Sequence, residues 1–402
     1  MRLAIISDDS LPTSRLVHAK MLHELAEELL KQGHTPIIIT PGKPKQNDRL
    51  IIESISNVKY WKFRSGNLRG QGKIRRAINE TLLSFKAWFA IRKKIISEPF
   101  DGVIYYSPSI FFGLLVKKIK EKNNCKSYLI LRDKFPQWAV DEGLIKKGSL
   151  IEKYFNYFEH VNYCASDFIG LMSPKNLSLF KTEYKGKFNT HVLYNWADVN
   201  APVVLTDYFD LRETLGLKDK VIFFYGGNIG HAQDMGNLLR LAGSMKVLQN
   251  AHFIFLGQGD EVDLVKSKIV SDHLTNTTFI NSVSQERYRQ ILAQVDVGLF
   301  SLAVSHRTHN FPGKLLGYMI ESLPILGSVN PDNDLIDIIT DSNAGFVFVN
   351  GQDEAFFEAA KNLAQNENSR KLVGQNSREL LVRQFSVESA AGSIIKCLAP
   401  TS

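Results

Sequence analysis

The chain has 402 residues, of which 44% are hydrophobic and 22% are charged, and its formal net charge is +8. This composition is typical of globular proteins and excludes a disordered chain, and the length predicts two domains rather than one. The three cysteines show no metal-type spacing, which favours a reducing compartment. The opening MRLAIISDDS has too short an apolar run for a signal peptide, and no run approaches the ~20 residues of a membrane span. We therefore expect a soluble protein.

Short apolar runs alternate with stretches of helical periodicity in the first half of the chain. The predicted strands are Leu3–Ser7, Pro36–Thr40, Val103–Tyr106, Tyr128–Leu131, Phe168–Met172 and Val192–Tyr194. The predicted helices are Val17–Gln32, Lys73–Ile96, Ile110–Glu121, Leu150–Ala165 and Pro174–Phe180. Continuous apolar strands that alternate with helices predict a parallel sheet covered on both faces.

The second half repeats this rhythm. Its predicted strands are Val221–Tyr225, His252–Leu256, Thr278–Ile280, Val297–Leu302, Ile325–Val329 and Phe346–Val349, and the last helices are Glu354–Gln365, Ser369–Gln384 and Val387–Cys397. The fold class is therefore α/β, with two doubly wound, Rossmann-like domains facing each other across a cleft. We expect domains at residues 1–200 and 201–384, followed by a final helix in 385–402.

Two segments of the second domain suit an anionic ligand. The loop FYGGNIGHAQ follows a predicted strand, and its glycines let the backbone approach a phosphate, although an ordinary turn is the alternative. It lacks the GxGxxG pattern of dinucleotide sites. In SHRTHNFPGKLLGYM, Lys314 is a cation in the first turn of a predicted helix, where the helix dipole disfavours positive charge. A phosphate bound there would offset this unfavourable interaction. A solvated surface lysine is the alternative interpretation.

The first domain offers a carboxylate at the end of a strand. In LILRDKFPQW, Asp133 follows the strand and can position a sugar hydroxyl or accept its proton, whereas a structural pair with Arg132 is the alternative. No metal-binding pattern and no nucleophile elbow occurs in the sequence. We therefore expect no metal and no cofactor.

A basic and aromatic stretch lies between residues 62 and 94, where ten Lys or Arg residues stand against one acidic residue, Glu80. Such a helix suits an anionic membrane surface. Charge alone does not distinguish membrane binding from nucleic-acid binding or from a helix face that is merely solvated. The proposed membrane patch consists of Lys73, Arg75, Arg76, Trp88, Phe89, Arg92, Lys93 and Lys94.

Five motifs follow one another along the chain: Pro12 with Gly33-His34, the phrase Arg132-Asp133 with Pro136, the turn Asn195 to Asp198, the loop Gly227 to Gln233, and Pro312 to Lys314. This ordered set resembles the retaining GT-B glycosyltransferases of family 4, and within them the bacterial L-fucosamine transferase subgroup. The chain departs from the family in four places. His309 and Gly317 replace the usual Glu pair, Asn228 and Gln233 replace the basic loop residues, Ser14 and Arg15 replace a Gly-Gly pair, and Gly313 replaces a serine.

The resemblance implies a metal-independent enzyme that moves a sugar, N-acetyl-L-fucosamine or a related acetamido sugar, from a UDP-sugar to a lipid-linked saccharide of O-antigen or capsule. It implies Asp133 and Lys314 as catalytic residues. It also implies that the final helix, in 385–402, crosses back to the first domain. The implied donor contacts are Gly227, Asn228, Gln233, Val283, Tyr288, Arg307, Pro312, Gly313, Lys314 and Leu315, and the acceptor contacts are Asp9, Ser14, Arg15, Arg132 and Lys134.

The expected location is the cytoplasmic face of the inner membrane, with no nucleic-acid partner. Two alternatives stay open: a GT-B epimerase or hydrolase acting on a UDP-sugar, and a non-enzymatic protein that binds sugar nucleotides or polyanions.

Overall fold

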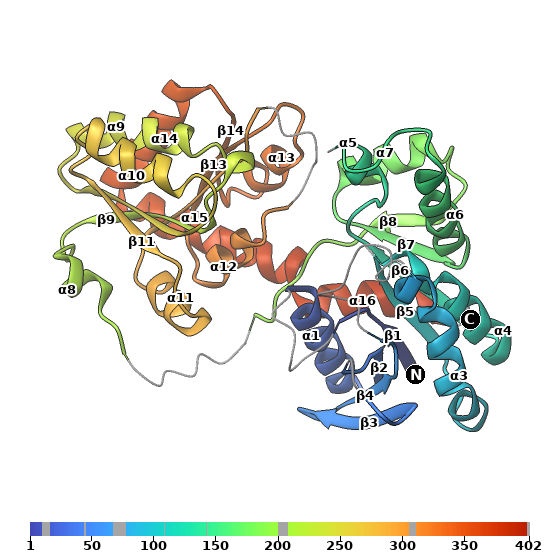
Figure 1. The fold of residues 1–402 in the computed structure, drawn as a ribbon. Coiled ribbons are helices and arrows are strands. Elements are labelled where there is room, and N and C mark those ends of the chain that lie inside the picture. The colour runs from blue at the N-terminus through green and yellow to red at the C-terminus, as the bar shows by residue number, and fades with distance from the viewer. Residues whose placement is uncertain are drawn as a thin grey trace. The chain divides into compact units, whose positions relative to one another are not determined.

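The structure is a computed structural model that describes residues 1–9, 17–43, 46–66, 78–107, 109–141, 143–199, 208–304 and 311–399. It divides into two compact units, Met1–Ala197 with Val387–Ser402 (unit 1) and Asp198–Ser386 (unit 2). The last helix thus belongs to the same unit as the N-terminus, and Val387 N donates to Ala197 O at 3.1 Å where the chain returns. Figure 1 labels the elements of both units.

Unit 1 is built on an eight-stranded sheet in the order β3-β4-β2-β1-β5-β6-β7-β8. Neighbouring strands are parallel except β3 and β4, which form an antiparallel hairpin. The strands are β1 Arg2–Ile6, β2 Thr35–Pro41, β3 Leu50–Ile55, β4 Val58–Phe63, β5 Gly102–Ser107, β6 Lys126–Leu131, β7 Phe168–Leu171 and β8 Thr190–Val192. The helices are α1 Val17–Lys31, α3 Leu83–Ser97, η1 Ile110–Phe112, α4 Gly113–Asn123, α5 Gln137–Asp141, α6 Leu150–Cys164, α7 Pro174–Glu183 and α16 Val387–Leu398.

Both faces of this sheet are covered by helices, as the continuous apolar strands predict. Side chains of α1 and α16 share one core with β1, and side chains of α3, α4 and α6 share the other. Figure 1 shows α1 and α16 beside each other. Strand β1 is therefore buried on both sides, so that only its end and the residues that follow it are open to a ligand.

Unit 2 is built on six parallel strands in the order β11-β10-β9-β12-β13-β14. The strands are β9 Val221–Asn228, β10 Ala251–Gln258, β11 Thr277–Asn281, β12 Val297–Ser301, β13 Ile325–Val329 and β14 Gly345–Val349. The helices are α8 Leu211–Leu215, η2 His231–Gln233, α9 Met235–Ser244, η3 Met245–Val247, α10 Val262–Ser271, α11 Gln285–Leu292, α12 Lys314–Ile320, α13 Leu335–Thr340, α14 Asp353–Gln365, α15 Glu367–Leu380 and the π-helical η4 Leu381–Phe385.

Three sequence expectations differ from the structure. The β3–β4 hairpin was not predicted; it turns through Ser56 and Asn57, whose φ values of 46° and 68° are those of a tight hairpin turn. The strand expected at Val192–Tyr194 lies earlier, at Thr190–Val192. The helix expected at Lys73–Ile96 is interrupted at Leu82: residues 78–81 are helical and α3 begins at Leu83, whereas residues 67–77 lie outside the described residues.

Candidate functional site

Each unit has one point where the order of its strands reverses. In unit 2, the chain builds outward from β9 through β10 to β11, and on the other side from β12 through β13 to β14. Ligands of open α/β sheets bind outside the carboxyl ends of the strands at such a switch point. The Gly226–Asn228 loop ends β9, and Ser301 ends β12. The glycine loop found in the sequence therefore lies at the ligand-binding edge of unit 2.

Lys314, the first residue of α12, lies against this loop. Its Nζ atom is 3.4 Å from the centroid of the Tyr225 ring. A Cβ atom placed on Gly227 would lie 3.5 Å from Lys314 Cε and 3.6 Å from Nζ. Among the described residues no carboxylate pairs with this ammonium group, and burial lowers the pKa of Lys314 well below its usual range. The site therefore holds an uncompensated amine beside a glycine backbone.

The glycines of the loop are required by their surroundings. Gly227 has a φ of +131°, which side-chain-bearing residues rarely adopt. A Cβ on Gly226 would lie only 2.6 Å from Cε2 of Tyr288, which packs beneath the loop from α11. Gly226 N donates to the Tyr318 hydroxyl at 3.3 Å, and burial raises the pKa of Tyr288 to about 12. Both tyrosines are thus neutral polar groups under the loop.

The two polar residues of the loop are paired with each other. Asn228 Nδ2 donates to Gln233 Oε1 at 2.8 Å. Asp234 ends this loop; its carboxylate accepts from Asn350 Nδ2 at 2.9 Å and caps α9 through Asn237 N at 3.3 Å. The end of the loop is therefore held by Asn350, which follows β14, and by the first turn of α9.

The remaining donor candidates differ in what they offer. Pro312 O accepts from Leu315 N at 3.0 Å, and the Leu315 side chain is completely buried, so only its backbone can reach a ligand. Gly313 has no atom within 4 Å of a Cβ position, so this glycine leaves open space. Val283 is half-buried just before α11. Arg307 lies outside the described residues.

In unit 1, the switch point lies between β1 and β5, and β6 follows β5. Asp133 comes two residues after β6, is partly open to solvent, and desolvation by the surrounding protein raises the pKa of its carboxyl, an effect that Arg132 partly offsets. The Arg132 guanidinium donates to Leu193 O at 2.7 Å and Tyr194 O at 3.0 Å, and burial lowers its pKa to about 10. Arg132 therefore ties β6 to the segment after β8.

The other predicted acceptor residues are distributed around this edge. Lys134 forms an ion pair with Glu183 of α7. Asp9 follows β1, and its backbone N–H donates to Ser7 Oγ at 3.4 Å. Ser14 and Arg15 lie outside the described residues. The structure thus brings Asp9 and Asp133 to one edge and turns Lys134 toward α7.

Two residues at this edge, His18 and Tyr106, were not singled out in the sequence. His18 in the first turn of α1 stacks on Tyr106 of β5, with ring centroids 5.1 Å apart and planes inclined by 18°. The Nε2 atom of His18 lies 3.5 Å from Oδ1 of Asp8. Only their positions in the sequence could have pointed to them, because Asp8 and Tyr106 lie at the ends of predicted strands and His18 lies in the first turn of the first predicted helix.

The basic and aromatic stretch is in part an exposed surface of unit 1. Phe89 is 50% exposed, Arg92 and Lys93 are exposed, and Trp88 packs against the core. Lys94 is half-buried and pairs with Glu98 at 3.8 Å. Lys73, Arg75 and Arg76 lie outside the described residues.

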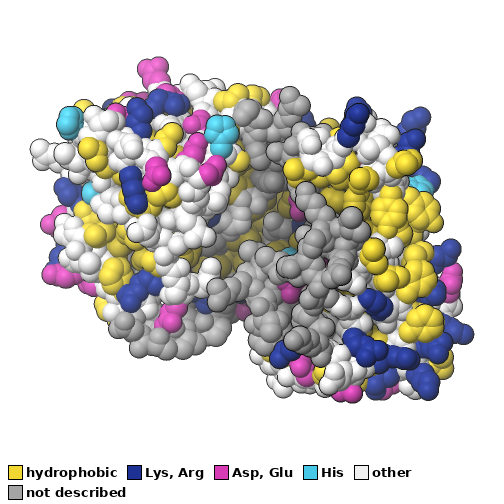
Figure 2. All heavy atoms as spheres, viewed as in Figure 1, with side chains coloured by type: hydrophobic (Ala, Val, Ile, Leu, Met, Phe, Trp, Pro, Cys, Tyr) yellow, Lys and Arg dark blue, Asp and Glu magenta, His cyan; other side chains and the backbone are white. Residues whose placement is uncertain are grey.

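Helix α6 adds apolar side chains that the sequence analysis did not assign to this surface. Leu150, Ile151 and Tyr157 are 83%, 60% and 61% exposed. Tyr154 Oη lies 2.5 Å from Thr81 Oγ1, which joins α6 to the turn before α3. Figure 2 shows apolar side chains gathered over α6, and Lys and Arg side chains over α3 and α4.

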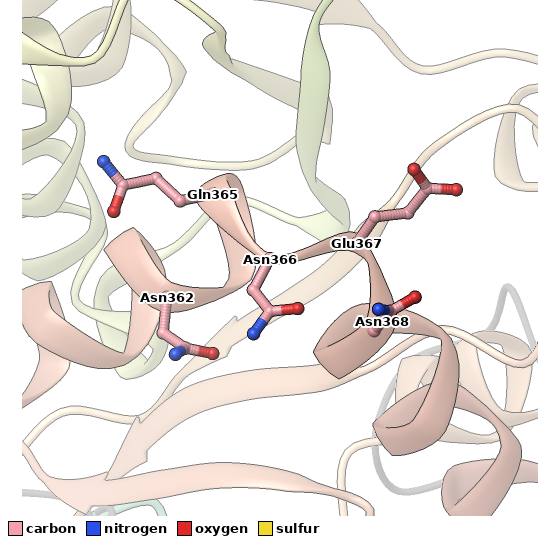
Figure 3. A pocket seen from close by; sticks show the side chains of 5 residues that line it. All are labelled: Asn362, Gln365, Asn366, Glu367 and Asn368. Carbon is pink, nitrogen blue, oxygen red and sulfur yellow. The ribbon is translucent and has the colours of Figure 1, made fainter.

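An open recess in unit 2 lies away from the switch point. Figure 3 shows its polar side chains at the junction of α14 and α15. Asn250, which directly precedes β10, donates to Ala364 O of α14 at 2.9 Å. This places the recess at the amino edge of the sheet, opposite to the glycine loop. The recess is lined by Asn362, Gln365, Asn366, Glu367 and Asn368.

No helix in the described part of the chain combines the length and the apolar character needed to cross a bilayer. In the same residues, no three His, Cys, Asp or Glu side chains are grouped as metal ligands would be.

Residues 207–380 match the model of a family described as Glycosyl transferases group 1. The chain is 25% identical over 225 residues to the "Probable glycosyltransferase WbjE" of Pseudomonas aeruginosa. That match covers 55% of this chain and 55% of the relative, so the chain spans about half the length of the curated relative it matches.

Two solved structures resemble the whole chain. One is WaaG, described as a glycosyltransferase involved in lipopolysaccharide biosynthesis, with 12% identity, a TM-score of 0.60 and coverage of 99% of this chain and 100% of that one. The other is HepE of Anabaena in complex with UDP and glucose, with 12% identity, a TM-score of 0.64 and coverage of 99% of both chains. The fold is that of GT-B glycosyltransferases, and the comparisons together support a glycosyltransferase.

Proposed function

We propose that this protein is a retaining glycosyltransferase that moves a sugar from a UDP-sugar, bound by unit 2, to a lipid-linked saccharide bound by unit 1. The observation that carries the proposal is the position of Lys314, whose amine lies beside Gly227 at the switch point of unit 2 and has no carboxylate partner among the residues that the structure describes. This site falls within the residues that match the glycosyl transferases group 1 family. The fold similarity to HepE, whose structure holds UDP and glucose, favours UDP as the nucleotide.

Lys314 would stabilise the charge that develops on the leaving diphosphate. In the absence of a ligand, burial disfavours the charged form of this amine. An adjacent diphosphate would supply the missing negative charge and raise the pKa of Lys314 again. A preorganised donor of this kind typically lowers a barrier by about 3–4 kcal/mol. The amine then takes the role that a metal ion has in other phosphate sites, and we propose that transfer proceeds without a metal.

Asp133 would orient the attacking hydroxyl from unit 1. It stands after β6, one strand from the switch point, and it is open to solvent. The raised pKa of its carboxyl favours a hydrogen-bonding role toward a sugar hydroxyl. Retention of the anomeric configuration needs no protein nucleophile on this account, and the leaving group departs from the face that the acceptor enters.

The membrane surface is the proposed location of the acceptor. Phe89, Arg92 and Lys93 on α3 lie on the same unit as the exposed apolar side chains of α6. Basic groups near aromatic and aliphatic side chains suit the interface of an anionic bilayer. We propose that the protein works peripherally on the cytoplasmic face of the inner membrane, in O-antigen or capsule synthesis, with N-acetyl-L-fucosamine or a related acetamido sugar as the transferred group.

The proposal is tested in two steps. A thermal-shift screen of UDP-sugars identifies the donor, because a ligand that binds only the folded protein raises its unfolding temperature. The donor that gives the largest shift is then incubated with the protein without acceptor. The transferase proposal predicts no turnover on the time scale of transfer. Rapid epimerisation or hydrolysis would favour the epimerase or hydrolase alternative, and the absence of any shift would favour a different ligand.

A further inference from the structure

We propose that strand β3 is an interface through which two copies of this chain form a symmetric dimer. Strand β3 lies at one edge of the unit 1 sheet, and antiparallel pairing of one β3 with another would join two eight-stranded sheets into one. The partner is a second copy because the sequence of this strand is complementary to itself. The proposal goes beyond the proposed function and does not depend on the reaction that the protein catalyses.

Strand β3 differs from the other edge strands in what it exposes. The two sheets end in four edge strands, β3, β8, β11 and β14. Strand β8 has only three residues, and the apolar side chains of β11 and β14 are buried or half-buried. In β3, by contrast, Ile51 and Ile52 are 36% and 45% exposed. Natural edge strands are protected by shortness, by Lys or by Pro, whereas the six residues LIIESI contain neither Lys nor Pro.

The hydrogen-bond register shows which backbone groups of β3 face away from its own sheet. Arg64 N, which follows β4, donates to Arg49 O at 3.1 Å, so the backbone groups of Arg49 point toward β4. The direction alternates along an antiparallel ladder, so the backbone groups of Ile51 also point toward β4. Those of Leu50 and Ile52 therefore point outward. Each of these two residues offers one donor and one acceptor to a further strand.

A second β3 strand matches these groups when the two copies run antiparallel about a two-fold axis at Ile51. Leu50 of each copy then exchanges hydrogen bonds with Ile52 of the other, and Ile51 lies opposite Ile51 of the other copy. The same register places Arg49 of each copy opposite Glu53 of the other. Apolar pairs and pairs of opposite charge that face each other directly across two strands stabilise a sheet. The strand is thus complementary to itself in its backbone, its apolar side chains and its charges.

The charged side chains also select this register. Arg49 is exposed, and the Glu53 side chain keeps 40% of its surface exposed although it forms an ion pair with Lys62 of β4. With the axis one residue further along, at Ile52, each Glu53 would instead lie opposite Ile51. An interface of this two-fold type uses the same surface on both copies, so association ends at two chains. Because the paired strands are short, we expect a weak dimer that forms as the concentration rises.

The test measures the mass of the full chain by sedimentation velocity over about a hundredfold range of concentration. We expect the average mass to rise from one chain toward two and no further. Arg49→Glu should raise the dissociation constant at least tenfold, because a carboxylate would then face Glu53, and Glu53→Arg should do the same. An equimolar mixture of these two variants should dimerise again, because every cross-strand charge pair is once more of opposite sign.

Two further variants keep the result independent of folding. Lys117→Glu changes the charge by the same amount at an exposed position of α4 and should dimerise like the wild type. Ile51→Lys leaves the ion pair between Glu53 and Lys62 in place, and it should prevent dimerisation by placing two ammonium groups on the axis. Thermal unfolding confirms that each variant is folded.

The proposal is overturned if the wild type stays monomeric at the highest concentration, or if its mass grows beyond two chains without limit. It is equally overturned if Arg49→Glu and Ile51→Lys dimerise like the wild type, which would place the interface elsewhere. A mixture of folded Arg49→Glu and Glu53→Arg chains that remains monomeric would rule out the register about Ile51.

Discussion

Lys314 Nζ lies 3.4 Å from the centroid of the Tyr225 ring, and within the described part of the chain an aromatic face and not a carboxylate accompanies this amine. A cation–π contact stabilises a cation without neutralising it. Burial nevertheless lowers the pKa of Lys314, so the amine gains its charge when an anionic ligand binds at the Gly227 loop. This relationship separates Lys314 from the lysines of the chain that pair with acidic neighbours.

Replacing Lys314 should affect catalysis far more than stability. We expect Lys314→Ala to lower kcat by about 10²–10³-fold, since a preorganised charge donor typically contributes about 3–4 kcal/mol to the transition state. The free energy of unfolding should not fall, because the change removes a desolvated amine. Initial rates and urea denaturation measure the two effects. Lys246→Ala, a change at an exposed lysine of unit 2, is the control, and an equal loss of activity in it would refute the assignment.

The loop conformation predicts a contrast between two glycines. Gly227→Ala should lower the free energy of unfolding by about 1–3 kcal/mol, because its φ of +131° is strained for alanine. Gly313→Ala should leave stability unchanged or raise it by about 0.4–1 kcal/mol, since its φ is −57° and the Cβ position is open. Denaturant unfolding compares them. Equal effects of both changes would argue against this loop geometry.

Much of the fold follows from the sequence because buried parallel strands are continuous apolar runs. The β3–β4 hairpin could not be predicted in this way, because its strands LIIESI and VKYWKF are not continuously buried. Its turn, Ser56-Asn57, also lacks the glycine that marks most tight hairpins. The break at Leu82 between the helical residues 78–81 and α3 was also not predicted, because the apolar residues on both sides of it continue the helical period.

The candidate site, too, could be predicted only in part from the sequence. Gly227, Asp133 and Lys314 could be found because each lies next to the end of a predicted strand or the start of a predicted helix. His18 and Tyr106 could not, because their stacking depends on the pairing of β1 with β5 and not on local sequence. Arg132 donates to two backbone carbonyls of a segment that is distant in the sequence. Its neighbours in the sequence therefore could not distinguish this structural role from a contact with a ligand.

Glu159 should make the protein less stable as the pH rises. Burial raises the pKa of this carboxyl to about 7, although a hydrogen bond from Tyr163 at 2.7 Å opposes the shift. The folded state then holds a proton that the unfolded state has lost, so the free energy of unfolding falls between about pH 4.5 and 7, by about 3 kcal/mol. Urea denaturation at both ends of this range measures it.

In Glu159→Gln that part of the pH dependence should be absent, because the amide accepts from Tyr163 without titrating. Glu121→Gln, at an exposed position at the end of α4, should behave like the wild type. A wild-type pH dependence that persists in Glu159→Gln would assign the effect to another group.

Membrane attachment should depend on both rings and charges. Phe89→Ser with Tyr157→Ser should weaken binding to anionic liposomes about tenfold or more, since burying an aromatic side chain contributes about 1.5–3 kcal/mol. Binding of the wild type should weaken in salt. Flotation measures both. Val270→Ser removes an exposed apolar side chain of unit 2 and should have no effect, whereas unchanged binding of the double variant would exclude this surface.

Transfer itself is the most direct test of the account. The purified protein is incubated with the UDP-sugar selected by thermal shift and with lipid-linked saccharides extracted from cells, in EDTA, and the lipids are analysed by mass spectrometry. We predict that one lipid-linked saccharide gains the mass of one sugar residue for each UDP released, and that Lys314→Ala nearly abolishes this gain. UDP release without any gain in lipid mass, or an undiminished gain in Lys314→Ala, would contradict the account.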